Sequence, residues 1–181
     1  MRKASLGAGY LAASNSKYGN GFAYGGSIIE GTGRFGFGLS FLSFTNSFTD
    51  SVLAINGGKP EYHVFRSEVT DFYISVLALY LRDNPKKGVL MLAGFGPEIH
   101  FLQASSQDYV ADFRSSGSDS RLGMGAILRY EKVIRMFGTA TFVATAAWSW
   151  MQAGIEVVDE FTPPTEGMTA GAVTVGLAFP F

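Results

Sequence analysis

The chain has 181 residues, of which 16% are charged and 14% aromatic, and its formal net charge is -1. Ordinary soluble domains carry about 25% charged residues, so this composition is unusual for them. The sequence has no run of about 18 apolar residues, which excludes a transmembrane helix, and no basic stripe, which argues against a nucleic-acid partner. The absence of Cys excludes disulfides and thiolate chemistry. The length suits one domain over residues 1–181.

Large and small residues alternate along most of the chain with the period of two that marks β-strands. The first alternating segment follows a short basic start, and we expect Met1 to stand where an export signal has been removed. Seven further segments repeat the pattern. We therefore predict eight strands, over residues 3–13, 21–29, 34–44, 67–81, 88–101, 121–131, 138–152 and 168–181.

The two faces of each predicted strand differ in kind. Large apolar side chains share one face, whereas Gly, Ser, Thr and Ala occupy the other, together with the charged residues Asp71, Glu98, Arg121 and Arg129. A soluble barrel would carry many more charges on its water-facing side. The pattern instead predicts an inside-out barrel, with the apolar face toward lipid and the small face toward a narrow lumen.

The connections alternate in predicted length. Residues 30–33, 82–87 and 132–136 read as short turns, residues 45–66, 102–120 and 153–167 as long polar loops, and residues 14–20 as a short exception. Outer-membrane barrels have tight periplasmic turns and long external loops, so both chain ends are expected on the periplasmic side. Aromatic residues at the strand ends then predict two girdles, Tyr80, Tyr130, Phe179 and Phe181 at the inner rim and Phe101, Trp148 and Trp150 at the outer rim.

The last strand has an unbroken apolar face formed by Val173, Val175, Leu177, Phe179 and Phe181. With the alternating connections and the strand of residues 121–131, which contains Gly-x-Gly at 123–125 and ends Arg-Tyr-Glu, it resembles the small eight-stranded bacterial outer-membrane barrels. That family includes outer membrane proteins A, X and W. One departure is the proline at position 180, which cannot donate a ladder hydrogen bond.

The resemblance implies an all-β fold, an eight-stranded antiparallel transmembrane up-and-down β-barrel in the bacterial outer membrane. The lipid bilayer and the outer-membrane assembly machinery are the partners it implies. The terminal apolar pattern resembles the signal that this machinery recognises.

Two groups of inward charged residues are candidate sites. Asp71, Glu98, His100 and Arg121 share inward parity near the outer ends of adjacent strands. A His beside carboxylates, with a hydroxyl from Ser75 or Thr145 across the lumen, could activate a nucleophile. Because buried charges are normally paired, we interpret the group as a structural polar cluster and predict no catalytic residue.

A second polar cluster is predicted from Arg34, Arg129 and Glu131 at the periplasmic end. His63 has Glu61 nearby but no partner spaced for metal binding, so we interpret it as a solvated loop residue. No metal site and no cofactor are expected.

Two features leave the function open. The lumen-facing residues toward the periplasmic end are Leu77, Leu79, Leu81, Leu90, Leu92 and Ile127. Packed together they would plug the barrel, and spaced apart they would line a route for a small apolar molecule, as the resemblance to outer membrane protein W implies. Residues 45–66 are too apolar for a merely solvated loop and would either extend the strands or contact an envelope protein.

The sequence therefore predicts a non-enzymatic integral outer-membrane barrel with a structural or partner-binding role. A narrow channel for small hydrophobic solutes is the alternative. A lipid-modifying enzyme is the third hypothesis.

Overall fold

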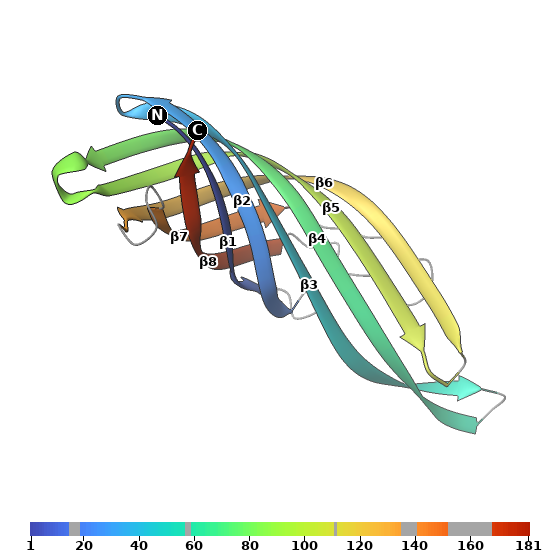
Figure 1. Ribbon diagram of the computed structural model, residues 1–181. Coiled ribbons are helices and arrows are strands. Elements are labelled where there is room, and N and C mark those ends of the chain that lie inside the picture. Colours follow the sequence, from blue (N-terminus) through green and yellow to red (C-terminus); the bar gives the residue numbers. More distant parts are fainter. Residues whose placement is uncertain (15–18, 57–58, 111, 135–140, 152–167) are drawn as a thin grey trace.

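The computed structural model describes residues 1–14, 19–56, 59–110, 112–134, 141–151 and 168–181, and the predicted eight-stranded antiparallel barrel is confirmed. The barrel is closed, and its strand order follows the chain from β1 to β8 (Figure 1). No helix in the described part of the chain is long and apolar enough to cross a membrane. The strands are β1 (Arg2–Ala13), β2 (Asn20–Thr32), β3 (Phe35–Asn56), β4 (Lys59–Asn84), β5 (Val89–Asp108), β6 (Phe113–Val133), β7 (Thr141–Met151) and β8 (Met168–Pro180).

The seam between β1 and β8 closes the barrel. The two strands pair from Lys3 opposite Pro180 to Ala13 opposite Ala170, so the ladder includes the proline and ends there, and Phe181 lies outside it. Gly176 is required at this seam, because a Cβ added there would lie 2.0 Å from the backbone oxygen of a β1 residue. The strand backbones thus approach closely where the first and last strands meet.

An apolar band surrounds the barrel. On β4 its outward side chains are Phe72, Ile74, Val76, Ala78 and Tyr80, and the next outward residues along the strand, on either side, are polar. The nine residues from Phe72 to Tyr80 match the roughly 9–11 that a tilted strand needs to cross a bilayer. Val76 is 55% exposed, which is costly in water and favourable in lipid. This band is where the barrel meets the hydrocarbon of a membrane.

Aromatic rings mark the edges of the band. Phe72 lies between Phe41 and Phe101, with ring centroids 6.2 and 6.1 Å away, and at the other edge Phe35 packs edge to face on Tyr80 at 5.9 Å. The residues predicted for the girdles all point outward and are exposed: Tyr80, Phe101, Tyr130, Trp148, Trp150, Phe179 and Phe181.

Two predicted long loops are strands instead. β3 and β4 continue through almost all of residues 45–66, so this segment extends the strands. The prediction of a loop at 102–120 is wrong, because β5 runs to Asp108 and β6 begins at Phe113. The hydrophobic alternation disappears there because the outward face changes to Ser, Thr and Gln, although the backbone ladder continues. The predicted long connection at 153–167 lies outside the described residues.

Figure 1 shows β3 to β6 extending well past the other four strands, away from the end that holds both chain termini. We call these two ends the hairpin end and the terminal end. At the terminal end, β2 turns into β3 through Gly33 and Arg34, where the φ of 65° at Gly33 suits glycine. β4 and β5 are joined there by the short 3₁₀ helix η1 (Pro85–Lys87).

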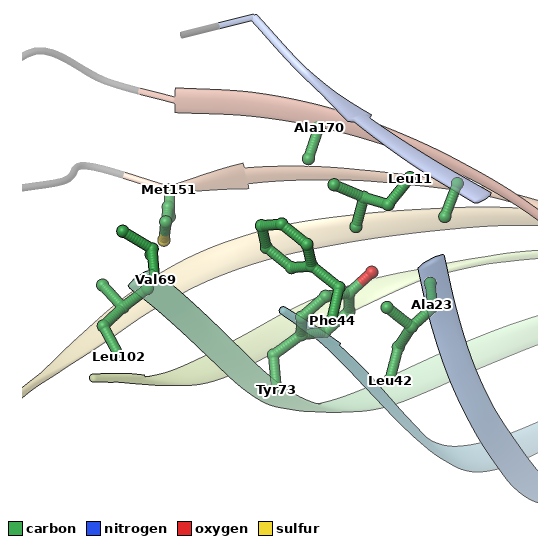
Figure 2. Close-up of a cluster of buried hydrophobic side chains, with 10 residues drawn as sticks. Leu11, Ala23, Leu42, Phe44, Val69, Tyr73, Leu102, Met151 and Ala170 are labelled. Carbon is green, nitrogen blue, oxygen red and sulfur yellow. The ribbon is translucent and has the colours of Figure 1, made fainter. Parts of the chain in front are cut away.

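Two apolar clusters fill the lumen at different levels. The six inward apolar residues predicted toward the terminal end pack together with Ile29, and we call this group the leucine cluster. Toward the hairpin end, the Phe44 cluster gathers side chains from several strands around Phe44, which is fully buried (Figure 2). Its members are Leu11, Ala23, Leu42, Phe44, Val69, Tyr73, Leu102, Met151, Ala170 and Ala172.

A charge introduced into the apolar band should be costly according to its depth. Val76→Arg, at the middle of the band on β4, should lower the free energy of unfolding in lipid vesicles by about 2–4 kcal/mol. The matched control Glu68→Arg lies on the same face of the same strand beyond the band, and it should cost less than about 1 kcal/mol. Equal costs for the two variants would contradict the position of the band.

Candidate functional site

A polar cluster lies in the lumen next to the two apolar clusters. Asp71 and Ser75 come from β4, Glu98 and His100 from β5, and Ser149 from β7, and we call these five residues the histidine cluster. All five are buried. On β5, Glu98 and His100 lie between Leu92 of the leucine cluster and Leu102 of the Phe44 cluster. The histidine cluster therefore lies in the lumen, between the levels of the two apolar clusters.

The histidine ring connects two carboxylates and a hydroxyl. His100 Nδ1 lies 2.9 Å from Asp71 Oδ2, and His100 Nε2 lies 3.1 Å from Ser149 Oγ and 3.4 Å from Glu98 Oε2. Ser75 donates to Glu98 Oε1 at 2.7 Å, and Ser149 donates to Glu98 Oε2 at 2.5 Å. The order of Ser149, His100 and Asp71 is that of a hydrolase triad. However, the hydroxyl donates to Glu98, and His100 is fully buried, so the hydrogen bonds of the group pair buried polar atoms with one another.

The motif of alternating glycines on β6 makes room for this cluster. A Cβ added to Gly125 would lie 1.9 Å from Glu98 Oε1, and one added to Gly123 would lie 3.1 Å from His100 Nε2. The two glycines therefore let Glu98 and His100 lie flat against the neighbouring strand.

The structure brings together three of the four residues predicted for the luminal cluster. Arg121 faces His100 in the β5–β6 register, but its side chain is 40% exposed and pairs with Asp119 at 2.6 Å. Of the two candidate hydroxyl residues, Ser75 joins the histidine cluster, whereas Thr145 lines a luminal cavity. Ser149, which sequence reasoning placed only on the inward face of its strand, bonds to the cluster.

A second ion-pair cluster lies toward the terminal end. Arg129 Nη2 lies 2.7 Å from Glu131 Oε1, and Lys3 Nζ lies 2.6 Å from Glu131 Oε2. Arg129 Nη1 also donates to the hydroxyls of Ser5 and Ser27 at 2.9 and 2.6 Å. Arg34, which the sequence predicted here, is exposed in the turn between β2 and β3, and Lys3 takes its place.

A small cavity separates the two polar clusters. Glu98 and Ser75 line it on one side and Arg129, Ser5 and Ser27 on the other, and its volume is about 60 Å³. That is room for a few water molecules, each with polar partners in the wall.

A third polar group lies beyond the apolar band, in the hairpin end. His63 Nδ1 lies 2.5 Å from Asp108 Oδ2, its Nε2 lies 3.9 Å from a carboxylate oxygen of Glu61, and its ring stacks near Phe65. The prediction of a solvated loop residue is wrong, because β5 extends far enough to bring Asp108 beside His63. The hydrogen bond to Asp108 is the largest effect and raises the pKa of His63 above its usual 6.5.

No group of three or more metal-ligating side chains is placed to hold a metal ion among the residues that the structure describes. The chemistry that the polar clusters support is hydrogen bonding and ion pairing inside the barrel and between the hairpins.

Comparison with known proteins bears on the fold. No protein-family model and no curated protein matches the sequence. Among solved structures, Neisserial surface protein A superposes with a TM-score of 0.60 at 15% identity, covering 99% of this chain and 97% of the other. A major outer membrane protein from Thermus thermophilus gives 0.66 at 16% identity, covering 99% and 98%. The Yersinia pestis protein Ail, in complex with the heparin analogue sucrose octasulfate, gives 0.55 at 14% identity, covering 98% and 99%.

These neighbours are small eight-stranded outer-membrane barrels, and the sequence-based resemblance to that class is confirmed. The closed barrel, its outward apolar band and the polar clusters buried in its lumen define the chain as a membrane-spanning β-barrel of the outer-membrane type.

Within the histidine cluster, the cost of removing a side chain should follow its burial. His100→Ala leaves the carboxylates of Asp71 and Glu98 buried without their shared partner, and should lower the free energy of unfolding by about 3–5 kcal/mol. Arg121→Ala removes a half-exposed ion pair and should cost less than about 1 kcal/mol. Urea unfolding of the reconstituted variants measures both. A larger cost for Arg121→Ala would show that the arginine belongs to the buried network.

The ion pair between the hairpins should depend on pH. The pKa of His63 is higher in the folded protein than its usual 6.5. The contribution of this ion pair to the free energy of unfolding is therefore complete below pH 6.5 and is lost as pH rises through the pKa of the folded protein. An NMR titration should give a pKa above 6.5 for His63, and Asp108→Asn should bring it back toward that value. Asp112→Asn, a carboxylate change at the same tip, is the control. An unchanged pKa in Asp108→Asn would exclude the proposed cause.

Proposed function

We propose that this protein is a non-enzymatic outer-membrane barrel whose hairpin end stands outside the cell and contacts an envelope protein. Both chain termini lie at the terminal end, with the short turns, which is the periplasmic arrangement of such barrels. The hairpins β3–β4 and β5–β6 would then project beyond the outer leaflet.

One observation carries the partner-binding role, an apolar patch at the ends of both hairpins. Polar outward residues of β3 to β6 separate this patch from the lipid-facing band, so lipid does not cover it. Exposed apolar patches with aromatic residues are typical of protein contact sites. The tip patch consists of Leu53, Tyr62, Val64, Tyr109 and Val110, and Tyr62 is 69% exposed.

The tip patch is held together by backbone and side-chain contacts. Leu53 lies directly opposite Tyr62 in the β3–β4 ladder. The Tyr109 amide donates to the Val64 carbonyl at 3.0 Å, which ties the second hairpin to the first, beside the ion pair of His63. A preformed patch loses little conformational entropy on binding, which favours recognition of a folded partner.

The ligand of one structural neighbour is of a different chemical kind. The solved Ail complex contains a heparin analogue, sucrose octasulfate, which is a sulfated saccharide. The tip patch is apolar and aromatic, so a protein surface is the partner that we propose for it.

A narrow channel for small hydrophobic solutes is the second candidate. Two apolar clusters cross the lumen at different levels, and only a cavity of about 60 Å³ lies between the polar clusters. This packing favours a closed barrel. Solute uptake or conductance steps in reconstituted vesicles would favour the channel.

A lipid-modifying enzyme is the third candidate. Its support is the triad-like order of Ser149, His100 and Asp71, but all three side chains are at least 97% buried inside the barrel. Lipid cannot reach such a hydroxyl without opening the wall. A change in the lipid profile on His100→Ala with the fold retained would favour the enzyme.

The assembly machinery remains a proposed partner of β8. Support comes from its uninterrupted outward face, in which the five apolar residues of the terminal pattern are all exposed toward lipid: Val173, Val175, Leu177, Phe179 and Phe181.

In-cell photocrosslinking tests the partner-binding role. A photoreactive amino acid in place of Tyr62, in the tip patch, should give a discrete adduct with an envelope protein, which mass spectrometry would identify. The same probe in place of Val76, in the apolar band, is the control and should label lipid. The proposal fails if Tyr62 gives no protein adduct, or only the adducts seen from Val76.

A further inference from the structure

A second surface of the hairpin end differs from the tip patch. On the outward face of β4 to β6, directly opposite residues form rows across the sheet. Phe72 and Phe101 form the aromatic edge of the apolar band, and the next row outward is Thr70, Gln103 and Ser118. Two residues farther along each strand, the outward surface therefore changes from lipid-facing aromatic rings to hydroxyl and amide groups.

The row beyond is also polar and is hollowed. Glu68, Ser105 and Ser116 lie opposite one another and, with the preceding row, line a hollow of about 540 Å³. Ala104 and Gly117 form part of its lining and are small, which gives the hollow its depth. Its lining begins at the row of Thr70, Gln103 and Ser118, directly beyond the aromatic edge of the band that contacts lipid.

The third row carries the positive charge. Arg66 and Arg114 stand on either side of Gln107, and both arginines are exposed. Arg66 lies six residue steps along β4 from Phe72 at the aromatic edge, which is about 20 Å along a strand. Guanidinium groups are suited to bidentate contacts with phosphate or carboxylate.

We propose that this face binds the saccharide headgroup of an anionic glycolipid whose acyl chains lie on the apolar band. The nine described side chains of the three rows include no apolar residue, which a protein interface would require at its centre. They offer hydrogen bonds for sugar hydroxyls and, at the far row, cations for an anionic substituent. Continuity with the lipid-facing band argues for a saccharide attached to a lipid rather than a free one.

This inference rests on the proposed placement of the hairpins outside the cell, where the outer leaflet surrounds them. The folded full chain would be titrated in detergent micelles with purified lipopolysaccharide, with its dephosphorylated form, and with the free saccharide released from it. Native mass spectrometry would report binding. Folding of every variant would be checked by the mobility of the unheated barrel on a gel.

The double variant Arg66→Ala with Arg114→Ala should bind lipopolysaccharide on the order of tenfold more weakly, because it loses charge-assisted hydrogen bonds. Arg82→Ala, an exposed arginine on the outward face of β4 at the terminal end, is the matched control and should bind like the original chain. Dephosphorylation should remove the difference between the double variant and the control, whereas Gln103→Leu should weaken binding of both lipid forms.

Equal affinity of the double variant and Arg82→Ala would overturn the proposal. If the free saccharide binds as tightly as lipopolysaccharide, the proposed glycolipid is wrong and the ligand is a soluble glycan. The placement of the hairpins has its own test, since Lys59→Cys should react with a membrane-impermeant maleimide on intact cells, in a chain that has no other Cys. If Lys59→Cys is not labelled, the proposed function is wrong. If it is labelled but the chain does not bind the glycolipid, only this inference is wrong.

Discussion

Closure of the sheet between β1 and β8 is the constraint on which the rest of this structure depends. In hydrocarbon, an open edge would expose a row of unpaired N–H and C=O groups, so a membrane-crossing sheet must close on itself. The eleven residue pairs from Lys3 opposite Pro180 to Ala13 opposite Ala170 provide that closure. Glycines meet at the seam, where Gly7 faces Gly176, and allow the close approach of the two strands.

Closing eight strands leaves a lumen that side chains must fill, and the interior shows the consequence. The buried carboxylates Asp71, Glu98 and Glu131 point inward and cannot reach bulk water, and each one has a partner from another strand. Glu98 receives hydrogen bonds from β4 and β7, and Glu131 pairs with Lys3 of β1 as well as with Arg129 of its own strand. The polar network therefore ties together strands far apart in the sequence. The same low dielectric would penalise any member left unpaired, which makes the network specific to this register.

Much of the fold could be predicted from the sequence because a period of two fixes which face each residue takes. The period of two could not fix the position of each residue along the barrel axis, because that position depends on the register between strands. Lys3 rather than Arg34 reaches Glu131. Nor could the period fix where a side chain turns, because Arg121 has the right parity and faces His100, yet its side chain pairs with Asp119. Ser149 carried no signal beyond its parity. The strand extensions at 102–120 were missed because residues such as Ser105 and Ser116 pair in a ladder with no apolar face to reveal it.

The extensions also show how a hairpin can stay ordered after it leaves the membrane. Lipid stabilises only the apolar band, so β3 to β6 must be held beyond it by their own inward contacts. The Phe44 cluster provides these at the exit of the barrel, where Val69 and Leu102 from the extended strands pack with residues of β1, β7 and β8. Farther out, the ion pair of His63 with Asp108 joins β4 to β5. Because the strands run without a break from the band to the tips, any ligand of the hairpins meets a surface whose position is set by the barrel itself.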